Sequence, residues 1–213
     1  MKNKIQIITF SGVDGAGKTT ILREFTKILE EKYKMQVKEL RHRPSVLPIL
    51  SAIKHGKTLA SEKTLEVLPR TGTNRSKVSS LIRFFYYLLD YIIGQWFIYF
   101  KYTKKNIVVI YDRYYFDFII DSRRTNIDLN GKFIKWFYRF VFKPEINIFL
   151  YAPAEVILSR KQEMDLDSIN KLTNEYNSLF KELKKTNKEI YESIENIDME
   201  KTLKIIENQL GND

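Results

Sequence analysis

Residues 12 to 19 read Gly-Val-Asp-Gly-Ala-Gly-Lys-Thr, a complete phosphate-binding loop pattern. An apolar run at residues 4–10 precedes the loop, and residues 21–29 after it carry apolar side chains at helical spacing. In a strand, loop and helix of this kind, backbone N–H groups and the positive end of the helix dipole surround a phosphate. The pattern therefore requires a strand and a helix that meet at the loop.

The loop combines backbone and side-chain roles. A side chain at Gly12 or Gly17 would hinder the close approach of a phosphate. Lys18 can reach the β- and γ-phosphates of a nucleoside triphosphate, and the Thr19 hydroxyl can bind Mg²⁺. The residues expected to contact the nucleotide are Gly12, Val13, Asp14, Gly15, Ala16, Gly17, Lys18, Thr19 and Thr20.

Four further segments have the composition of buried strands, and long helical patterns separate them. They are residues 36–41, 106–111, 146–151 and, more weakly, 189–194. Alternating strands and helices predict an α/β fold with a five-stranded parallel sheet and helices on both faces. Since ligands of such folds gather at the carboxyl ends of the strands, the residues directly after each strand are the candidates for chemistry.

The 213 residues suggest one domain, 1–213, in which the irregular segment 44–76 forms a cap or a mobile loop. The chain has no cysteine, which excludes disulfides and thiolate metal sites. No basic-then-apolar leader precedes the loop, so we expect a cytoplasmic protein.

Charge is unevenly spread along the chain. Residues 1–143 carry a net charge of +15, and residues 144–213 carry −5. A basic region favours nucleotides, nucleic acid or an anionic membrane surface as partners. We favour nucleotides because a phosphate site is already visible, and no nucleic-acid-binding signature accompanies the charge.

Two aromatic segments need separate interpretation. Residues 81–100 are rich in apolar side chains, but Arg83, Asp90 and Gln95 interrupt them, which favours a buried helix lining a cleft over a membrane span. Asp90 and Arg83 would then face a ligand or each other. Residues 132–143 are both basic and aromatic, and such a helix either packs on the sheet with its lysines reaching outward or lies on an anionic membrane.

Asp112 and Arg113 directly follow the strand predicted at 106–111. An Asp at this strand end can hold Mg²⁺, directly or through water. The neighbouring Arg can pair with the acceptor or with the transferred phosphate. We therefore assign Thr19 and Asp112 to the metal and Arg113 to the catalytic group.

Three stretches together resemble the thymidylate kinase family of P-loop nucleoside monophosphate kinases. They are residues 10–20, which contain the loop; residues 108–114, Val-Val-Ile-Tyr-Asp-Arg-Tyr; and residues 149–160, Phe-Leu-Tyr-Ala-Pro-Ala-Glu-Val-Ile-Leu-Ser-Arg. The resemblance implies a three-layer P-loop kinase fold and Mg²⁺-dependent phosphoryl transfer from ATP to a phosphorylated small-molecule acceptor.

The resemblance also assigns roles to single residues. Arg160, in a short lid at 160–168, would supply positive charge to the transferring phosphoryl group, as lid arginines do in bacterial members. Asp14 would contact the acceptor sugar, and Arg43, in Arg41-His42-Arg43-Pro44, would bind the acceptor phosphate. Family members often form homodimers through a helix such as 78–100.

The chain differs from the family at the positions that recognise the acceptor. Asp90-Tyr91 stands in place of an Asp-Arg pair, Ser11 replaces a Glu, and the Gly-Gly-Thr after the Arg-x-Pro is missing. An Asp/Arg set, Asp117, Asp121, Arg123 and Arg124, replaces an Ala-Tyr-Gln stretch. Asp117 and Asp121 would share a face of a helix near 114–120, where the set either binds a polar phosphorylated acceptor or is paired in water.

These observations leave three alternative functions for the protein. The first is a nucleoside monophosphate kinase, with dTMP as the model acceptor. The second keeps the kinase chemistry on a phosphorylated sugar or a glycolipid head group, which the aromatic and basic segment would bring to a membrane surface. The third is a nucleotide-binding switch without transfer activity.

Overall fold

The computed structural model describes residues 6–44, 46–47, 74–162 and 164–211. Contacts between Cα atoms group the chain into two compact units. Unit 1 comprises Met1–Arg41, Phe100–Tyr114 and Lys143–Asp213, and unit 2 comprises His42–Tyr99 and Tyr115–Phe142. The cap predicted at 44–76 lies mostly outside the described residues, and the single-domain organisation stays a prediction.

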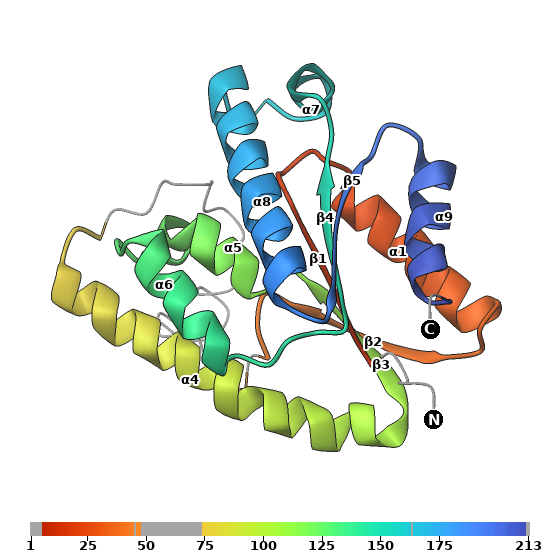
Figure 1. The fold of residues 1–213 in the computed structure, drawn as a ribbon, viewed down its shortest axis with the longest axis horizontal. Helices are drawn as coiled ribbons and strands as arrows, with labels where there is room; N and C mark the ends of the chain where they lie inside the picture. Colours follow the sequence, from red (N-terminus) through yellow and green to blue (C-terminus); the bar gives the residue numbers. More distant parts are fainter. Residues whose placement is uncertain (1–5, 45, 48–73, 163, 212–213) are drawn as a thin grey trace. The chain divides into compact units, whose positions relative to one another are not determined.

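Unit 1 is built on one parallel sheet (Figure 1). Its strands are β1 (Ile7–Gly12), β2 (Gln36–Arg41), β3 (Ile107–Asp112), β4 (Ile146–Tyr151) and β5 (Ile190–Glu195). The strand order is β2-β3-β1-β4-β5, and every neighbouring pair is parallel. The predicted five-stranded parallel sheet is confirmed.

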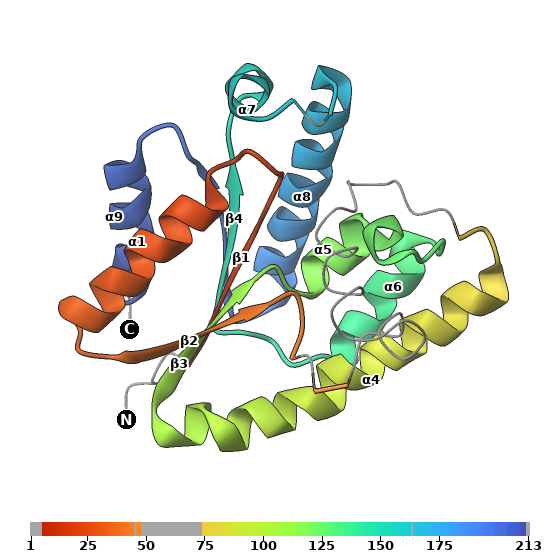
Figure 2. The same cartoon turned by 180° about the vertical axis from the view of Figure 1, so that it is seen from behind.

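Helices cover both faces of this sheet. Figures 1 and 2 show α1 (Lys18–Glu31) and α9 (Met199–Gln209) on one face and α8 (Leu166–Thr186) on the other. A short helix, α7 (Ala154–Arg160), follows β4, and the 3-10 turn η1 (Thr103–Lys105) precedes β3. The α/β fold with helices on both faces is therefore confirmed as well.

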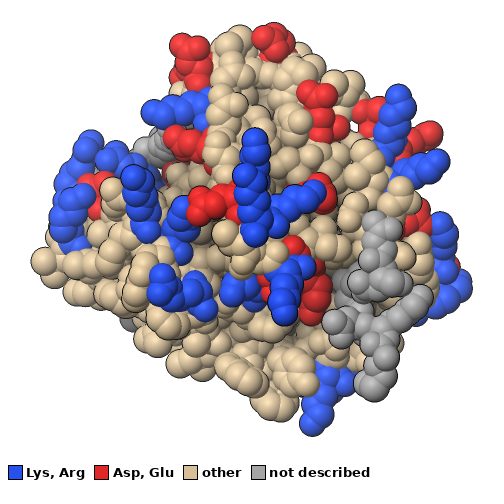
Figure 3. Space-filling model, in the orientation of Figure 1, with Lys and Arg blue, Asp and Glu red and all other residues tan. Residues whose placement is uncertain are grey.

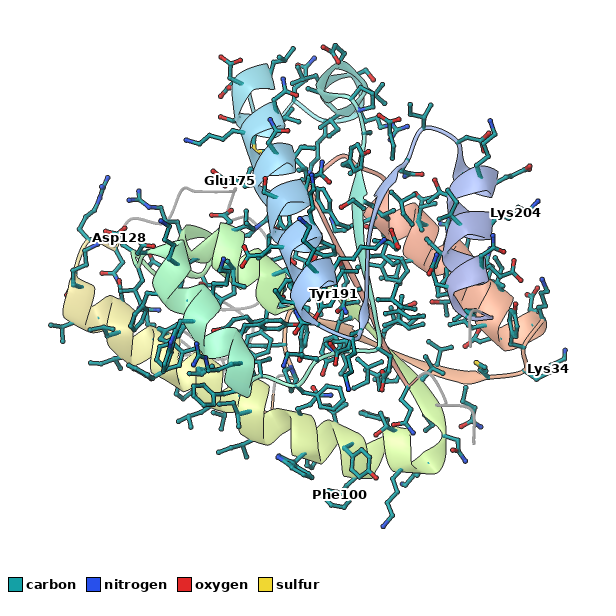
Figure 4. The ribbon with its side chains drawn as sticks, in the orientation of Figure 1. Lys34, Phe100, Asp128, Glu175, Tyr191 and Lys204 are labelled. Carbon is teal, nitrogen blue, oxygen red and sulfur yellow. The ribbon has the colours of Figure 1, made fainter. Side chains whose placement is uncertain are left out.

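The central strands are apolar on both faces because each face meets a helix. On β4, Ile148 and Leu150 join the buried cluster that contains Phe25 of α1. Phe149 points the other way and stacks on Tyr176 of α8, with ring centroids 4.7 Å apart. Tyr191 of β5, labelled in Figure 4, extends this second layer. Side chains that alternate along β4 thus fill two cores.

Unit 2 is helical and packs mainly through aromatic rings. It contains most of α4 (Lys77–Lys101), together with α5 (Tyr115–Ile120), η2 (Ser122–Thr125), α6 (Gly131–Phe137) and η3 (Tyr138–Phe140). The ring of Phe84 lies 5.7 Å from Phe118, 5.5 Å from Phe133 and 5.1 Å from Phe137. The Tyr115 hydroxyl of α5 donates to the Ile134 carbonyl of α6 at 3.0 Å. Within this unit α6 therefore packs on α4 and α5, whereas the sequence favoured packing on the sheet.

The helix predicted as buried, α4, is buried along only one side. Phe84, Tyr87, Asp90 and Tyr91 lie on the buried side, while many of its apolar side chains remain exposed. Among the described helices, none combines the length and apolar character needed to cross a bilayer.

Candidate active site

The glycines of the loop are required by its geometry. Gly15 and Gly17 have positive φ angles of 89° and 82°, which L side chains rarely adopt. A Cβ atom at Gly12 would lie 2.4 Å from the Leu150 carbonyl oxygen of the neighbouring strand, so only glycine fits there. Strand β1 ends at Gly12, and the loop turns directly into α1.

The loop leaves the first turn of α1 open to an anion. The residue before the helix, Gly17, provides no side-chain cap, and the first turn carries no acidic residue. The positive end of the helix dipole is therefore not compensated locally. Lys18 is 8% exposed, and the side chains of Thr19 and Thr20 are exposed. This arrangement suits the binding of a polyphosphate.

Asn196 holds the loop from the neighbouring strand end. It directly follows β5, and its buried side-chain amide donates a hydrogen bond to the Ala16 carbonyl, with a 2.8 Å donor–acceptor distance. Its own backbone N–H donates to the Tyr151 carbonyl at 2.7 Å. Asn196 was not among the predicted site residues, although its position at a strand end is the same signal that indicated Asp112.

The end of α7 also meets the loop. The Arg160 guanidinium lies 3.5 Å from the Gly15 carbonyl oxygen. A Cβ atom at Gly15 would lie 3.0 Å from Ile157 and 3.5 Å from Lys161, both close to Arg160 in the chain. Arg160 is exposed, so its cationic group borders the loop and remains accessible to a ligand.

Asp112 has a carboxylate oxygen suited to a cation. Strand β3 ends at this residue, in register with Phe10 of β1. Its Oδ1 atom is buried and makes no hydrogen bond, while its Oδ2 atom lies 3.8 Å from the Arg41 guanidinium. A buried carboxylate oxygen without a donor is the kind of ligand that Mg²⁺ prefers. The residues described contain no cluster of three or more acidic or histidine side chains, so a metal here would also need oxygens from a phosphate or water.

Arg113 and Asp14 form an ion pair beside the loop. The guanidinium also lies 3.4 Å from the Gly12 carbonyl oxygen. Both side chains are largely buried, and Arg113 adopts a φ angle of 74°. The two residues predicted to touch the acceptor or the transferred phosphate therefore contact each other, and Asp14 fixes the direction of the Arg113 side chain.

In unit 2, Arg43 and Asp90 form a buried ion pair. The Asp90 Oδ1 atom also accepts hydrogen bonds from the backbone N–H groups of Val46 and Leu47, at 3.0 and 2.9 Å. Arg43 donates to the Leu47 carbonyl at 3.0 Å. Asp90 thus pairs with Arg43, whereas the sequence predicted that it faces a ligand or Arg83.

Neighbouring side chains support this pair. The Arg43 guanidinium lies 5.0 Å from the centre of the Tyr87 ring. Burial raises the pKa of the Tyr87 phenol, and the positive charges of Arg43 and Arg83 oppose that shift. A Cβ atom at Gly94 would lie 2.8 Å from Pro44, so glycine allows the segment that carries Arg43 to approach α4 closely.

The other predicted acceptor residues lie at and after α5. This helix ends at Ile120, and Asp121, with φ −132°, lies outside it. Asp117 and Asp121 are buried, and Arg123 and Arg124 are half-buried in η2. The Asp121 N–H still donates to the Asp117 carbonyl at 2.8 Å, so the two residues remain on consecutive turns.

Arg123 has a local partner. It donates to Asp128 at 3.0 Å, and the same carboxylate accepts from Lys77 at 2.9 Å. These hydrogen bonds, chiefly that from Lys77, lower the pKa of Asp128. Figure 4 labels Asp128 near the first turn of α4.

Comparisons with known proteins agree with this geometry. The family model described as thymidylate kinase matches residues 10–210. A crystal structure of thymidylate kinase from Ehrlichia chaffeensis has a similar fold, with a TM-score of 0.59 and 16% sequence identity. The similarity covers 95% of this chain and 98% of that one. The chain belongs to the thymidylate kinase family and is a P-loop nucleotide kinase.

Proposed function

We propose that this enzyme transfers the γ-phosphoryl group of ATP, with Mg²⁺, to the phosphate of a nucleoside monophosphate such as dTMP. The observation that carries the proposal is the geometry of the loop. Gly15 and Gly17 have left-handed backbone conformations, and the N-terminus of α1 has no side-chain cap, an arrangement suited to binding a polyphosphate. The family membership supports the same reaction class.

The proposed roles follow from the positions of the side chains in unit 1. Lys18 would bind the β- and γ-phosphates, and Arg160 would stabilise charge that develops on the transferring group. Thr19 and Asp112 would hold Mg²⁺, which when bound neutralises charge on the phosphates. Arg113, oriented by Asp14, would contact the transferred or the acceptor phosphate.

Arg43 is the proposed ligand of the acceptor phosphate, with Arg83, Asp90, Asp117, Asp121, Arg123 and Arg124 as further candidates on the acceptor side. Since Asp90 already pairs with Arg43, acceptor binding would draw Arg43 at least partly from this carboxylate. The affinity for the acceptor is then reduced by the free energy needed to separate the pair.

One observation favours a second acceptor class, a phosphorylated sugar or a glycolipid head group. Tyr91 stands where the resemblance places an arginine that contacts base and phosphate. Its ring is buried, and its hydroxyl donates to the His42 carbonyl at 2.8 Å. This position therefore offers no guanidinium to a thymine nucleotide.

A coupled assay of ADP release tests both acceptor classes. We expect ADP formation with Mg-ATP to depend on one member of a panel of nucleoside monophosphates, sugar phosphates and lipid-linked phosphates. Turnover with a nucleoside monophosphate supports the first class, and turnover only with a sugar or lipid phosphate supports the second. No acceptor-dependent turnover by folded protein across the panel contradicts the proposal.

We predict that Asn196→Ala raises the KM for ATP on the order of tenfold, because leaving the buried Ala16 carbonyl of the loop without its donor costs ~1–3 kcal/mol. Asn196→Asp keeps the size of the side chain but cannot donate to the Ala16 carbonyl, so it should be at least as damaging. Steady-state kinetics at varied ATP provide the measurement. A wild-type KM in Asn196→Asp would show that the amide donor has no role.

We predict that Asp112→Asn raises the Mg²⁺ concentration for half-maximal activity by about tenfold or more, as expected when a carboxylate near a metal is lost. Titrating activity with Mg²⁺ at fixed ATP measures this. The exposed Asp167, near the start of α8, provides the matched control. An identical Mg²⁺ dependence in Asp112→Asn and Asp167→Asn would rule out Asp112 as a metal residue.

A further inference from the structure

Arg41 and Arg43 are two residues apart in the chain but have different partners. The Arg43 guanidinium is buried in its ion pair with Asp90 of unit 2. Arg41 is the last residue of β2, its side chain is 60% exposed, and its Nε atom lies 3.8 Å from Asp112 Oδ2 in unit 1. Between the two arginines the backbone of His42 is left-handed, with a φ angle of 63°. Arg41 therefore faces the carboxylate assigned to Mg²⁺.

The sheet determines the position of Arg41 beside Asp112. The two residues are partners in the parallel ladder of β2 and β3. Because side chains alternate along a strand, Arg41 shares a face of β2 with Glu39, whose carboxylate accepts a hydrogen bond from Thr26 of α1 at 2.9 Å. Asp112 shares a face of β3 with Ile110, a member of the buried cluster to which α1 contributes. Both side chains therefore lie on the α1 face of the sheet, at its carboxyl edge.

The phosphate-binding loop leads to the same face and edge. Strand β1 ends at Gly12, and α1 begins at Lys18 and covers this face of the sheet, as Figures 1 and 2 show. Thr19, in the first turn of α1, therefore lies at the carboxyl edge as well. The two residues assigned to Mg²⁺ and the Arg41 guanidinium thus share one edge of one face.

An arginine beside a carboxylate is common on this protein, and proximity alone does not indicate a role. On the face drawn in Figure 3, blue side chains lie beside red ones at several places. Asp112 has a further property, since its Oδ1 atom is buried and makes no hydrogen bond. A buried carboxylate needs a positive charge to offset its lost hydration. Arg41 supplies such a charge at Oδ2, and a bound Mg²⁺ would supply it at Oδ1.

We propose that Arg41 competes with Mg²⁺ for the charge of Asp112 and so sets how strongly the enzyme prefers the magnesium complex of ATP to free ATP. This inference rests on the proposed assignment of Asp112 to the metal. A guanidinium and a divalent cation at one carboxylate repel each other, so each weakens the binding of the other. With free ATP, by contrast, Arg41 reduces the repulsion between Asp112 and the phosphates. Arg41 therefore favours free ATP relative to its magnesium complex.

Calorimetry of nucleotide binding measures this preference without turnover. The readout is the ratio of two affinities for a non-hydrolysable ATP analogue, one at millimolar Mg²⁺ and one in EDTA. Arg41→Gln should raise this ratio about fivefold, the effect of one unit charge a few ångströms away in a water-like medium. Arg41→Lys retains the positive charge and should keep the ratio within about twofold of the wild type. A ratio in Arg41→Lys equal to that in Arg41→Gln would contradict a role of the charge.

Arg23→Gln is the matched control. Arg23 is an exposed arginine of α1 that pairs with Glu24 at 3.0 Å, so its replacement makes the same change in net charge within unit 1. Because salt screens exposed charges, we expect its ratio to stay within about twofold of the wild type. An equal rise in Arg23→Gln and Arg41→Gln would show that net charge alone is responsible, and this would overturn the proposal. An unchanged ratio in Arg41→Gln would also overturn it.

Two further variants separate this inference from the proposed function. Asp112→Asn should lower the ratio, and Arg41→Gln/Asp112→Asn should give the same ratio as Asp112→Asn, because Arg41 acts through the carboxylate. If Asp112→Asn lowers the ratio but Arg41→Gln does not raise it, the metal role of Asp112 is supported and competition by Arg41 is refuted. A wild-type ratio in folded Asp112→Asn would refute both.

Discussion

Replacing Lys18 by alanine should lower kcat on the order of a hundredfold or more, while the protein remains folded. Lys18 is the buried cation at the start of α1, directly after the left-handed Gly17. A cationic group placed where charge develops during phosphoryl transfer has an effect of this size. Alanine is the best helix former, so the first turn of α1 should survive the change. Steady-state kinetics and circular dichroism together provide the measurement.

Lys27→Ala is the matched control for this prediction. Lys27 lies on the same helix, is exposed and pairs with the neighbouring Glu24. Exposed ion pairs contribute about 0–1 kcal/mol, so this variant should keep both its activity and its stability. Near-normal turnover in Lys18→Ala, at saturating ATP and acceptor, would refute the role of Lys18.

The second large effect concerns stability. Asp90→Asn should lower the free energy of unfolding by about 3–5 kcal/mol, the range seen when one partner of a buried ion pair is removed. The Asp90 side chain is 0% exposed, and the Arg43 side chain is 10% exposed. Asparagine can still accept from the N–H groups of Val46 and Leu47, so the variant tests the charge and not the hydrogen bonds. Urea denaturation followed by circular dichroism measures the change.

Two further variants make this result specific. Arg43→Met/Asp90→Leu removes both charges and should recover much of the lost stability, because apolar pairs of similar volume replace buried ion pairs at little cost. Asp128→Asn removes a more exposed carboxylate, paired with Lys77 and Arg123, and should cost about 1 kcal/mol or less. An unchanged unfolding midpoint in Asp90→Asn would mean that Arg43 and Asp90 are not paired in solution.

The sheet was predictable because its strands are short apolar runs between helical patterns. Four of the five predicted strands agree with the structure within one residue at each end. The first strand was predicted at 4–10 and is observed at Ile7–Gly12, and residues 4 and 5 lie outside the described residues. The loop and Asp112 were found for a related reason. The loop begins and Asp112 lies at the end of a buried strand, where the topology of the sheet fixes the position of a residue independently of the contacts that its side chain makes.

Partners of side chains were less predictable. Asp90 was recognised as an unusual charge in an apolar helix, but its partner Arg43 is 47 residues away in the chain, and periodicity carries no information on such a contact. Asn196 was missed because asparagine after a weak strand is common, and only the close approach to Ala16 shows its role. The segment predicted as a helix at 132–143 forms α6 and η3, and α6 packs on α4 through rings whose pairing depends on three-dimensional structure.

The most direct test of the account is isothermal titration calorimetry of the wild-type protein with a non-hydrolysable ATP analogue at millimolar Mg²⁺. We expect saturable binding at one site, weakened in the presence of EDTA, because the loop amides, Lys18 and the residues assigned to Mg²⁺ act on the same polyphosphate. No saturable heat with either an adenine or a guanine triphosphate analogue, from protein shown to be folded, would contradict nucleotide binding at this loop and the proposed reaction with it.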